Sequence, residues 1–321
     1  MENPKIIICD CDHKDVNNEK EVFDAAGMDF KWLQCATQEE VIEKCQGAVC
    51  FLNQYVRMDR KIFEALPTLK CVVRYGVGVD NVNLKDATEY GVQVCSVPDY
   101  GTNEVADHAL ALMMAVTRKI HKIATLTEQG VWEYARTVPV HRFSTRTIGL
   151  LGCGRIGRAF AARAHVLGAR VIAYDVAYGQ PGFETLDYVE YLSEDEVLAQ
   201  SDILSIHSLL NEETAGMMNT ETFSKMKDGA YFINVSRGGL VDEAALDAAL
   251  TSGKLSGAGI DVVCKEPLSK DSPLFRHDNV IITPHMAWYS EESAVDLKRK
   301  CAEEAVRFMR GEAVRCPVNK I

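Results

Sequence analysis

Short apolar runs alternate with amphipathic stretches over residues 1–100 of the chain. The runs have the length of buried strands, and they cover residues 5–9, 48–52, 71–74 and 92–95. The stretches between them place apolar residues at helical spacing, and they cover residues 17–26, 38–45 and 59–66. Because alternating strands and helices are typical of a parallel sheet covered by helices, this region predicts an α/β domain.

The pattern changes at Thr102, where it predicts one long amphipathic helix. The apolar residues of this helix recur at helical spacing, at Val105, Ala109, Leu112, Met113, Val116 and Ile120. Thr102 or Asn103 can cap the helix, and Glu104 suits the positive end of its dipole. The apolar stripe is longer than one face of a sheet needs, so we expect it to build a homodimer. A long core helix within a monomer is the alternative.

A second series of strands and helices follows the long helix. Its predicted strands cover residues 147–151, 171–174, 203–206, 230–234, 256–260 and 280–283. Six strands is the number in a doubly wound sheet that binds a dinucleotide. The helical segment 291–310 comes too late for another unit of that sheet, so we expect it to pack onto the first domain. The expected domains are therefore residues 1–100, completed by 290–321, and residues 101–289.

A glycine-rich turn joins the strand at 147–151 to a predicted helix at 158–167. The turn has the G-x-G-x-x-G pattern, and its predicted cofactor-binding residues are Gly152, Gly154, Arg155, Ile156 and Gly157. Gly152 permits a tight turn, Gly154 lets the backbone approach a pyrophosphate, and Gly157 lets the helix pack closely on the strand. The helix N-terminus faces the phosphate charge. This strand–turn–helix context favours a dinucleotide site over a glycine turn without a ligand.

An acidic residue, Asp175, ends the second strand of this series. A carboxylate at this place accepts hydrogen bonds from the ribose hydroxyls and repels a 2′-phosphate. No Arg or Lys follows directly, since the next residues are Val176, Ala177 and Tyr178. The sequence therefore favours NAD over NADP as the cofactor. The alternative is that Asp175 only caps the strand.

Charged residues follow three later strands at the points where the buried pattern ends. They are Arg237, Glu266 and His285. Ligands of an open α/β sheet lie beyond the carboxyl ends of its strands, so these side chains are expected at one edge. An Arg can hold and polarise a 2-oxo acid, a His can donate the proton, and a Glu can keep that His protonated. Each residue alone has a purely structural interpretation, but their joint placement favours a reductase site.

Composition and charge exclude several classes of partner. The formal net charge of -11 argues against nucleic acid or an anionic membrane as the main partner. No apolar run is long enough to span a bilayer or to act as a secretory signal. The cysteines are scattered, and Cys9 and Cys11 lack a second cluster that would complete a metal site. We therefore expect a cytoplasmic protein with reduced thiols and no metal.

Together these segments resemble the D-isomer-specific 2-hydroxyacid dehydrogenases over nearly the whole chain. The resemblance implies a Rossmann dinucleotide-binding domain and a discontinuous, flavodoxin-like substrate domain, both doubly wound. It assigns catalysis to Arg237, Glu266 and His285. Residues 73–82 are similar to the substrate loop of phosphoglycerate dehydrogenases. That similarity implies that the segment binds the substrate carboxylate through the backbone amides of Val77 and Gly78.

The same resemblance implies further contacts with the cofactor. Asp261 matches a carboxylate that holds the nicotinamide amide. The remaining residues assigned to the cofactor site are His207, Leu209, Thr214, Val235 and Ser236.

The segment 284–291 resembles a closer subgroup, the C-terminal-binding proteins, which are dehydrogenase-like corepressors. In that subgroup the Trp lines the substrate pocket, which nominates Trp288. Tyr75 replaces a residue that is commonly small, so we expect it to narrow the pocket or to add a hydroxyl to it. The subgroup also supplies the main alternative function, a non-enzymatic NAD(H)-responsive scaffold. No regulatory domain is expected after Ile321.

Other dehydrogenase classes fit the sequence less well, and the substrate stays open. Formate dehydrogenases carry an amide at the position of Glu266, and L-lactate and L-malate dehydrogenases place the glycine fingerprint near the N-terminus. Arg74 favours a phosphate, as in 3-phosphoglycerate, whereas Trp288 and Tyr75 favour an apolar or aromatic 2-oxo acid. Glyoxylate and hydroxypyruvate are further candidates.

Overall fold

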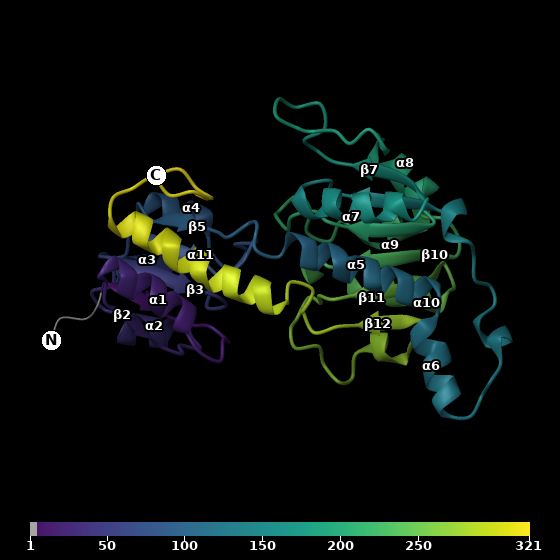
Figure 1. The fold of residues 1–321 in the computed structure, drawn as a ribbon, viewed down its shortest axis with the longest axis horizontal. Helices are drawn as coiled ribbons and strands as arrows, with labels where there is room; N and C mark the ends of the chain where they lie inside the picture. Colours follow the sequence, from purple (N-terminus) through teal and green to yellow (C-terminus); the bar gives the residue numbers. More distant parts are fainter. Residues whose placement is uncertain (1–4) are drawn as a thin grey trace. The chain divides into compact units, whose positions relative to one another are not determined.

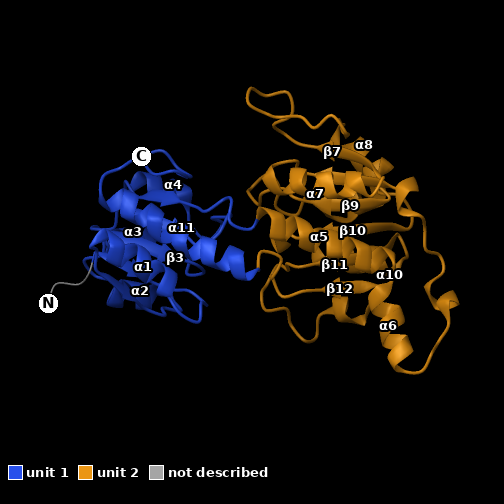
Figure 2. Cartoon of the chain, viewed as in Figure 1, with its two compact units in different colours: residues 1–101, 290–321 blue, residues 102–289 orange. Residues whose placement is uncertain are grey.

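The computed structural model of the protein describes residues 5–321, which divide into two compact units (Figure 2). Unit 1 consists of Met1–Gly101 and Ser290–Ile321, and unit 2 consists of Thr102–Tyr289. Residues 1–4, which belong to the segment considered for a secretory signal, lie outside the described residues. No helix within residues 5–321 is long and apolar enough to cross a membrane.

Unit 1 is built on a parallel five-stranded sheet (Figure 1). The strands follow the order β2-β1-β3-β4-β5 and comprise β1 (Ile6–Ile8), β2 (Phe30–Trp32), β3 (Cys50–Asn53), β4 (Cys71–Arg74) and β5 (Gln93–Cys95). This is the strand order of a flavodoxin-like sheet. The apolar pattern does not predict β2, because that strand is short, only partly buried and has Lys31 at its centre.

Helices cover both faces of this sheet. One face carries α1 (Asn17–Ala26) and α11 (Glu291–Met309), and the other carries α2 (Gln38–Lys44), α3 (Arg60–Ala65) and α4 (Leu84–Glu89). The last helix, α11, packs on α1, β3 and β4. Its Lys298 Nζ donates to the carbonyl oxygen of Asp15 at 2.9 Å. The C-terminal segment of the chain is therefore part of a unit that is built mainly from the N-terminal segment.

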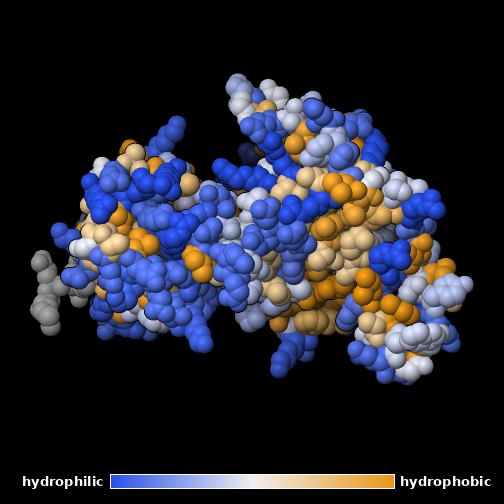
Figure 3. Space-filling model, in the orientation of Figure 1, coloured by the Kyte–Doolittle hydropathy of each residue, from blue (hydrophilic) through white to orange (hydrophobic). Residues whose placement is uncertain are grey.

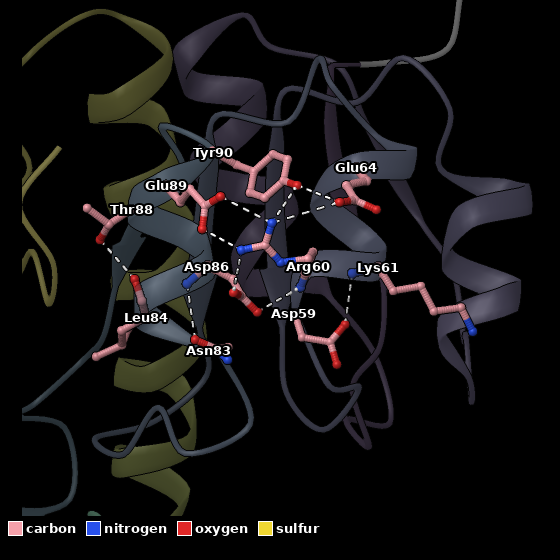
Figure 4. A network of polar contacts seen from close by, with 10 residues as sticks. All are labelled: Asp59, Arg60, Lys61, Glu64, Asn83, Leu84, Asp86, Thr88, Glu89 and Tyr90. Atoms are coloured by element: carbon pink, nitrogen blue, oxygen red, sulfur yellow. Dashed lines mark hydrogen bonds and ion pairs between the residues drawn. The ribbon is translucent and has the colours of Figure 1, made fainter.

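A surface network joins α3 to α4 within unit 1 (Figure 4). The guanidinium of Arg60 forms ion pairs with Asp86 and Glu89 and donates to the hydroxyl of Tyr90 at 3.1 Å. The hydrogen bond that the guanidinium donates to Glu89 raises the pKa of Arg60. Arg60 and Glu89 are about half exposed and only Asp86 is largely buried, so the network fixes the relative position of two short helices and adds little stability.

Unit 2 is built on a parallel seven-stranded sheet in the order β12-β11-β10-β9-β6-β7-β8. Its strands are β6 (Thr147–Leu151), β7 (Arg170–Tyr174), β8 (Val189–Tyr191), β9 (Ile203–Ile206), β10 (Ala230–Asn234), β11 (Leu255–Ile260) and β12 (Val280–Ile282). Six strands lie where the sequence predicts them. The expectation of six strands in all is wrong, because β8 extends the sheet beyond β7. This edge strand has only one buried residue, Val189, and so carries no apolar signal.

Each face of the unit 2 sheet has its own hydrophobic cluster. On one face α5 (Thr102–Thr117) and α7 (Arg155–Val166) pack on the strands, and on the other α8 (Glu194–Gln200), α9 (Thr220–Lys225) and α10 (Glu243–Thr251) do so. Leu112 and Phe160 are fully or almost fully buried in the first cluster, as Leu204 and Leu246 are in the second. The sheet is thus covered on both sides, as expected of a doubly wound fold.

The long helix predicted from Thr102 to Ile120 is interrupted. The helix α5 ends at Thr117, Lys119 has a left-handed backbone with φ 55°, and a separate helix α6 (Ile120–Glu128) begins after it. The apolar stripe of α5 packs against β10, β11 and α7 and is buried within unit 2. The stripe residues from Val105 to Val116 are therefore core residues and are not available for a dimer, whereas Ile120, the last residue of the predicted stripe, lies in α6 and is 54% exposed. The homodimer itself stays a prediction.

Candidate active site and cofactor site

The glycine fingerprint forms a tight turn between β6 and α7, and the three glycines differ in what surrounds them. A Cβ added at Gly152, whose φ is 93°, would lie 2.7 Å from the backbone carbon of His207, and one at Gly157 would lie 2.3 Å from the carbonyl oxygen of Gly152. A Cβ at Gly154 would meet no atom within 4 Å. The fold itself thus requires the first and third glycines, whereas the second leaves its backbone open to an approaching ligand.

The helix that follows this turn presents its N-terminus to the same open space. Gly154 is the N-cap of α7, and Arg155 and Ile156 form the start of its first turn. The helix begins at Arg155, three residues before the predicted start, so the fingerprint leads directly into it. The first turn contains no acidic side chain, so the partial positive charge and free amides remain available for an anion. This geometry fits a pyrophosphate.

Asp175 lies next to the fingerprint, just after β7. Its Oδ2 accepts a hydrogen bond from the amide of Cys153 at 2.6 Å, and its Oδ1 accepts one from the amide of Ala177 at 2.8 Å. Each oxygen retains a lone pair for a further donor. The carboxylate is therefore oriented by the backbone and can still accept hydrogen bonds from two ribose hydroxyls.

The loop after β9 and the end of β10 form the rest of the predicted cofactor site. Burial lowers the pKa of His207 to about 3, so its imidazole is neutral, and Nε2 lies 2.9 Å from the hydroxyl of Ser205. Thr214 closes the loop by donating to the carbonyl of Leu209 at 2.6 Å. The side chain of Leu209 is 70% exposed. Next to this loop, Val235 is buried and the hydroxyl of Ser236 donates to the carbonyl of Ile206 at 2.9 Å.

The predicted catalytic residues come from the loops that follow β10, β11 and β12. Nδ1 of His285 lies 2.7 Å from Oε2 of Glu266, and Oε1 of Glu266 accepts the amide of Val263 at 3.2 Å. Burial acts to raise the pKa of Glu266, but the hydrogen bond from His285, the amide of Val263 and the charge of Arg237 outweigh it and lower that pKa. An ionised carboxylate against an imidazole can hold a proton ready for transfer.

The imidazole of His285 is presented by an unusual turn. The backbone φ of His285 is 53°, in the left-handed region. Such a conformation costs on the order of 1 kcal/mol or more and persists only where its surroundings fix it. Asp261, predicted to hold the nicotinamide amide, is 1% exposed and accepts the amides of Met286 and Ala287. The structure thus uses this carboxylate within the turn that carries His285. Trp288, two residues later than Met286, is partly buried.

Within unit 1, the segment predicted to bind substrate follows β4. Gly76 has a φ of 135°, and within residues 5–321 the amides of Val77 and Gly78 donate no hydrogen bond, so both can bind an anion. Tyr75 differs from the expectation. It is 2% exposed, and its hydroxyl donates to Oε1 of the buried Glu19 at 2.9 Å. The expectation that Tyr75 adds a hydroxyl to a pocket is therefore wrong, because this group is used inside unit 1.

No group of three or more His, Cys, Asp or Glu side chains within residues 5–321 has an arrangement that could hold a metal ion. All of the cysteines are free thiols, and Cys9 and Cys11 are both buried.

Comparison with known proteins identifies relatives over most of the chain. Residues 110–287 match the family described as D-isomer specific 2-hydroxyacid dehydrogenase, NAD binding domain. A D-3-phosphoglycerate dehydrogenase of Archaeoglobus fulgidus is 38% identical over 294 residues, which is 91% of this chain but 55%, about half, of that protein. A glyoxylate reductase of Korarchaeum cryptofilum is 37% identical over 276 residues, 85% of this chain and 82% of that protein.

Solved structures show the same architecture. The D-lactate dehydrogenase of Aquifex aeolicus, complexed with NAD and lactic acid, matches with a TM-score of 0.86 and 26% identity over 96% of each chain. The strand orders, the fingerprint and the sequence matches agree with the resemblance inferred from the motifs. On these grounds the chain belongs to the D-isomer specific 2-hydroxyacid dehydrogenases and contains their NAD-binding domain.

Proposed function

We propose that this protein interconverts a small 2-oxo acid and its D-2-hydroxy acid by hydride transfer. The observation that carries the proposal is the 2.7 Å contact between His285 Nδ1 and Glu266 Oε2 at the carboxyl edge of the NAD-binding sheet. Bound NADH would supply the hydride and NAD would accept it. The protein's own residues would bind the substrate and move the proton.

Each of the three catalytic residues has a distinct part in this proposal. Glu266 engages Nδ1 of His285, so Nε2 is the nitrogen that donates a proton to the developing alkoxide. In the reverse direction the neutral imidazole accepts that proton. Arg237, whose charge lowers the pKa of Glu266, would bind the substrate carboxylate and polarise the carbonyl.

The cofactor residues fit NAD. Gly154 leaves room for a pyrophosphate at the N-terminus of α7, and Asp175 is held where it can accept ribose hydroxyls. The residues that follow β9 and β10 remain proposed contacts of the cofactor. They are His207, Leu209, Thr214, Val235 and Ser236. A direct hydrogen bond between Asp261 and the nicotinamide amide also remains a prediction. The carboxylate of Asp261 already accepts hydrogen bonds from two backbone amides of the His285 turn.

The substrate class follows from groups that would bind an anion. The free amides of Val77 and Gly78 would bind the carboxylate, and the guanidinium of Arg74 folds against Gly76 beside them. Trp288 offers an apolar surface. Relatives named for glyoxylate, hydroxypyruvate and 3-phosphoglycerate make these short oxo and hydroxy acids the first candidates.

A substrate screen tests the proposal directly. NADH absorbance would be followed with glyoxylate, hydroxypyruvate, pyruvate and aromatic 2-oxo acids, and NAD reduction with D-3-phosphoglycerate. We expect turnover of at least one, and we expect it to be lost in His285→Ala. If NADH binds but no 2-oxo acid is reduced, the NAD(H)-responsive scaffold becomes the better explanation.

The homodimer remains part of the proposal, but on a different surface. Large apolar side chains are exposed on and after α6, where Ile120 is 54%, Trp132 89%, Tyr134 86% and Val138 63% exposed. Figure 3 shows hydrophobic residues, in orange, mixed with polar ones over α6. Exposed patches of this kind mark protein interfaces, and a second copy is the partner that the family resemblance implies. Light scattering should give a dimer mass, and Trp132→Glu should shift it toward the monomer, whereas an exposed control, Val166→Glu, should not.

We also propose a cytoplasmic location. The free thiols of the chain, most of them buried, support it, since such thiols are typical of a reducing compartment. Fractionation with a tagged protein would test it.

A further inference from the structure

Three consecutive backbone amides at the His285 turn converge on Asp261. The amide of His285 donates to the carbonyl oxygen of Asp261 at 2.8 Å, that of Met286 to Oδ1 at 3.0 Å, and that of Ala287 to Oδ2 at 2.8 Å. Asp261 is 1% exposed, so water does not compete for these bonds. This one buried residue thus fixes the backbone of the turn that carries the proposed proton donor.

The same carboxylate is tied to helix α5 through Thr283. The hydroxyl of Thr283 donates to Oδ1 of Asp261 at 2.5 Å, and Nε2 of His108 lies 2.9 Å from the same hydroxyl oxygen. An ionised carboxylate can only accept, so the single hydroxyl proton is committed to Asp261. The hydroxyl oxygen must then accept from His108, which therefore carries a proton on Nε2. His108 thus donates a hydrogen bond to Thr283, and Thr283 donates one to Asp261.

The conformation of His285 depends on this support. With a φ of 53°, the residue lies in a region that side chains other than glycine seldom occupy. A turn released from Asp261 would relax toward an ordinary conformation and rotate the imidazole. The contact of Nδ1 with Glu266, at 2.7 Å, would then be lost.

We propose that Thr283 and His108 are positioning residues for the proposed reductase. Their hydrogen bonds to Asp261 hold the turn so that His285 faces Glu266. The inference rests on the proposed function, and neither residue contacts the reacting atoms. His108 is 175 residues from Thr283 in the chain, so the link exists only in the folded protein.

Two substitutions at Thr283 distinguish the effect of its hydroxyl group from the effect of its methyl group. Thr283→Val keeps the shape and removes the donor to Asp261, whereas Thr283→Ser keeps the donor and removes a methyl group. We expect Thr283→Val to lower kcat for 2-oxo acid reduction by roughly 10- to 100-fold, as misplacement of a catalytic group does, with a much smaller change in KM. Thr283→Ser should restore most of the activity.

An NMR titration of the His285 imidazole gives a readout that does not need turnover. The charged group that contacts this imidazole is Glu266, 2.7 Å from Nδ1. Arg237 acts on Glu266, and Asp261 holds the backbone of the turn. Of these, the contact of the imidazole with Glu266 is the one that the titration should report. In Thr283→Val the midpoint of the titration should move to lower pH, since the imidazolium loses its carboxylate partner. In Thr283→Ser it should stay in place.

A second pair of variants, at His108, tests the inference even if the Thr283 variants fail to fold. His108→Gln retains an N–H donor and should behave as the unsubstituted protein, whereas His108→Leu should behave as Thr283→Val. Equal losses in Thr283→Ser and Thr283→Val, or an unmoved titration midpoint in Thr283→Val and His108→Leu, would overturn the inference. If the unsubstituted protein reduces no 2-oxo acid, the proposed function fails, yet the titration still decides whether these residues position His285.

Discussion

Nδ1 of His285 lies 2.7 Å from Oε2 of Glu266, although the two residues are 19 positions apart and each side chain remains more than a third exposed. The imidazole raises the fraction of ionised Glu266, whose pKa is lowered despite its partial burial. The pair therefore favours the charge arrangement that oxo acid reduction needs, an imidazolium beside a carboxylate.

Removal of that charge should move the pH profile of the reaction. In Glu266→Gln the imidazolium loses its partner, so the upper pH limit of kcat/KM for reduction should move to lower pH. The lower limit for oxidation of the hydroxy acid should move in the same direction, because oxidation needs the neutral imidazole. Rates across pH in both directions would measure the two limits.

A neighbouring carboxylate provides the matched control. Glu243 accepts the amide of Cys264 at 2.6 Å and so helps to hold the same loop, without a contact to His285. Glu243→Gln should leave the profile in place. If Glu266→Gln lowers activity equally at every pH, then Glu266 only orders the loop, and the proposed pairing is rejected.

Loss of the proton donor itself should cost more than loss of its partner. His285→Ala should lower kcat for reduction by on the order of 10²–10⁴-fold, the usual contribution of a general acid. NADH binding, followed by fluorescence, should persist, because the fingerprint lies on other loops. A variant that keeps near-normal kcat would show that His285 is not the acid.

Asp175 should decide between the two nicotinamide cofactors. Its carboxylate would repel a 2′-phosphate, so NADH should support turnover far better than NADPH, and Asp175→Ala should narrow the difference in kcat/KM. Because Asp175 also accepts the amides of Cys153 and Ala177, Asp175→Asn is needed as a second variant that keeps an acceptor. Equal efficiency with both cofactors in the unsubstituted protein would contradict this assignment.

The fingerprint glycines should separate folding from cofactor binding. Gly157→Ala would place a Cβ 2.3 Å from the carbonyl oxygen of Gly152, so β6 and α7 must move apart and Tm should fall. Gly154→Ala meets nothing within 4 Å, so its Tm should be unchanged while its Kd for NADH rises. Thermal unfolding and NADH titration of both variants would show whether the two effects are distinct.

Buried His13 should make unit 1 sensitive to acid. Burial lowers the pKa of His13 from 6.5 to about 4, and its side chain is 4% exposed. Between these two pH values the unfolded chain binds a proton that the folded protein does not. The contribution of His13 to the free energy of unfolding is therefore fully present above about pH 6.5. It falls as the pH decreases toward 4, by on the order of 3 kcal/mol.

The variant His13→Gln should show a shallower loss of stability over this range. The free energy of unfolding from urea titrations between pH 7 and pH 4, about the range set by the two pKa values, would measure it. The exposed His121 serves as the control, since His121→Gln should follow the unsubstituted protein. Parallel curves for His13→Gln and the unsubstituted protein would show that another group causes the acid sensitivity.

Much of this architecture could be read from local sequence. Helix α1 and strands β4, β6, β9 and β10 have the predicted bounds, because apolar spacing of period two or 3.6 reports burial of each segment by itself. The fingerprint was recognisable for a similar reason, since a tight turn and a close helix–strand contact require glycine at fixed spacing. Arg237, Glu266 and His285 were found as charged residues that follow buried strands, and the resemblance to a family joined them.

Long-range packing decided what the sequence could not. The stripe from Val105 to Val116 has the same pattern whether it faces a sheet or a second subunit, and only the contacts of α5 with β10 and β11 place it in the core. The hydroxyl of Tyr75 is taken up by Glu19, 56 residues away, and the turn at His285 is held by Asp261, Thr283 and His108. Such partners depend on which distant segments pack together in the folded protein. The spacing of residues along the chain does not show which segments these are.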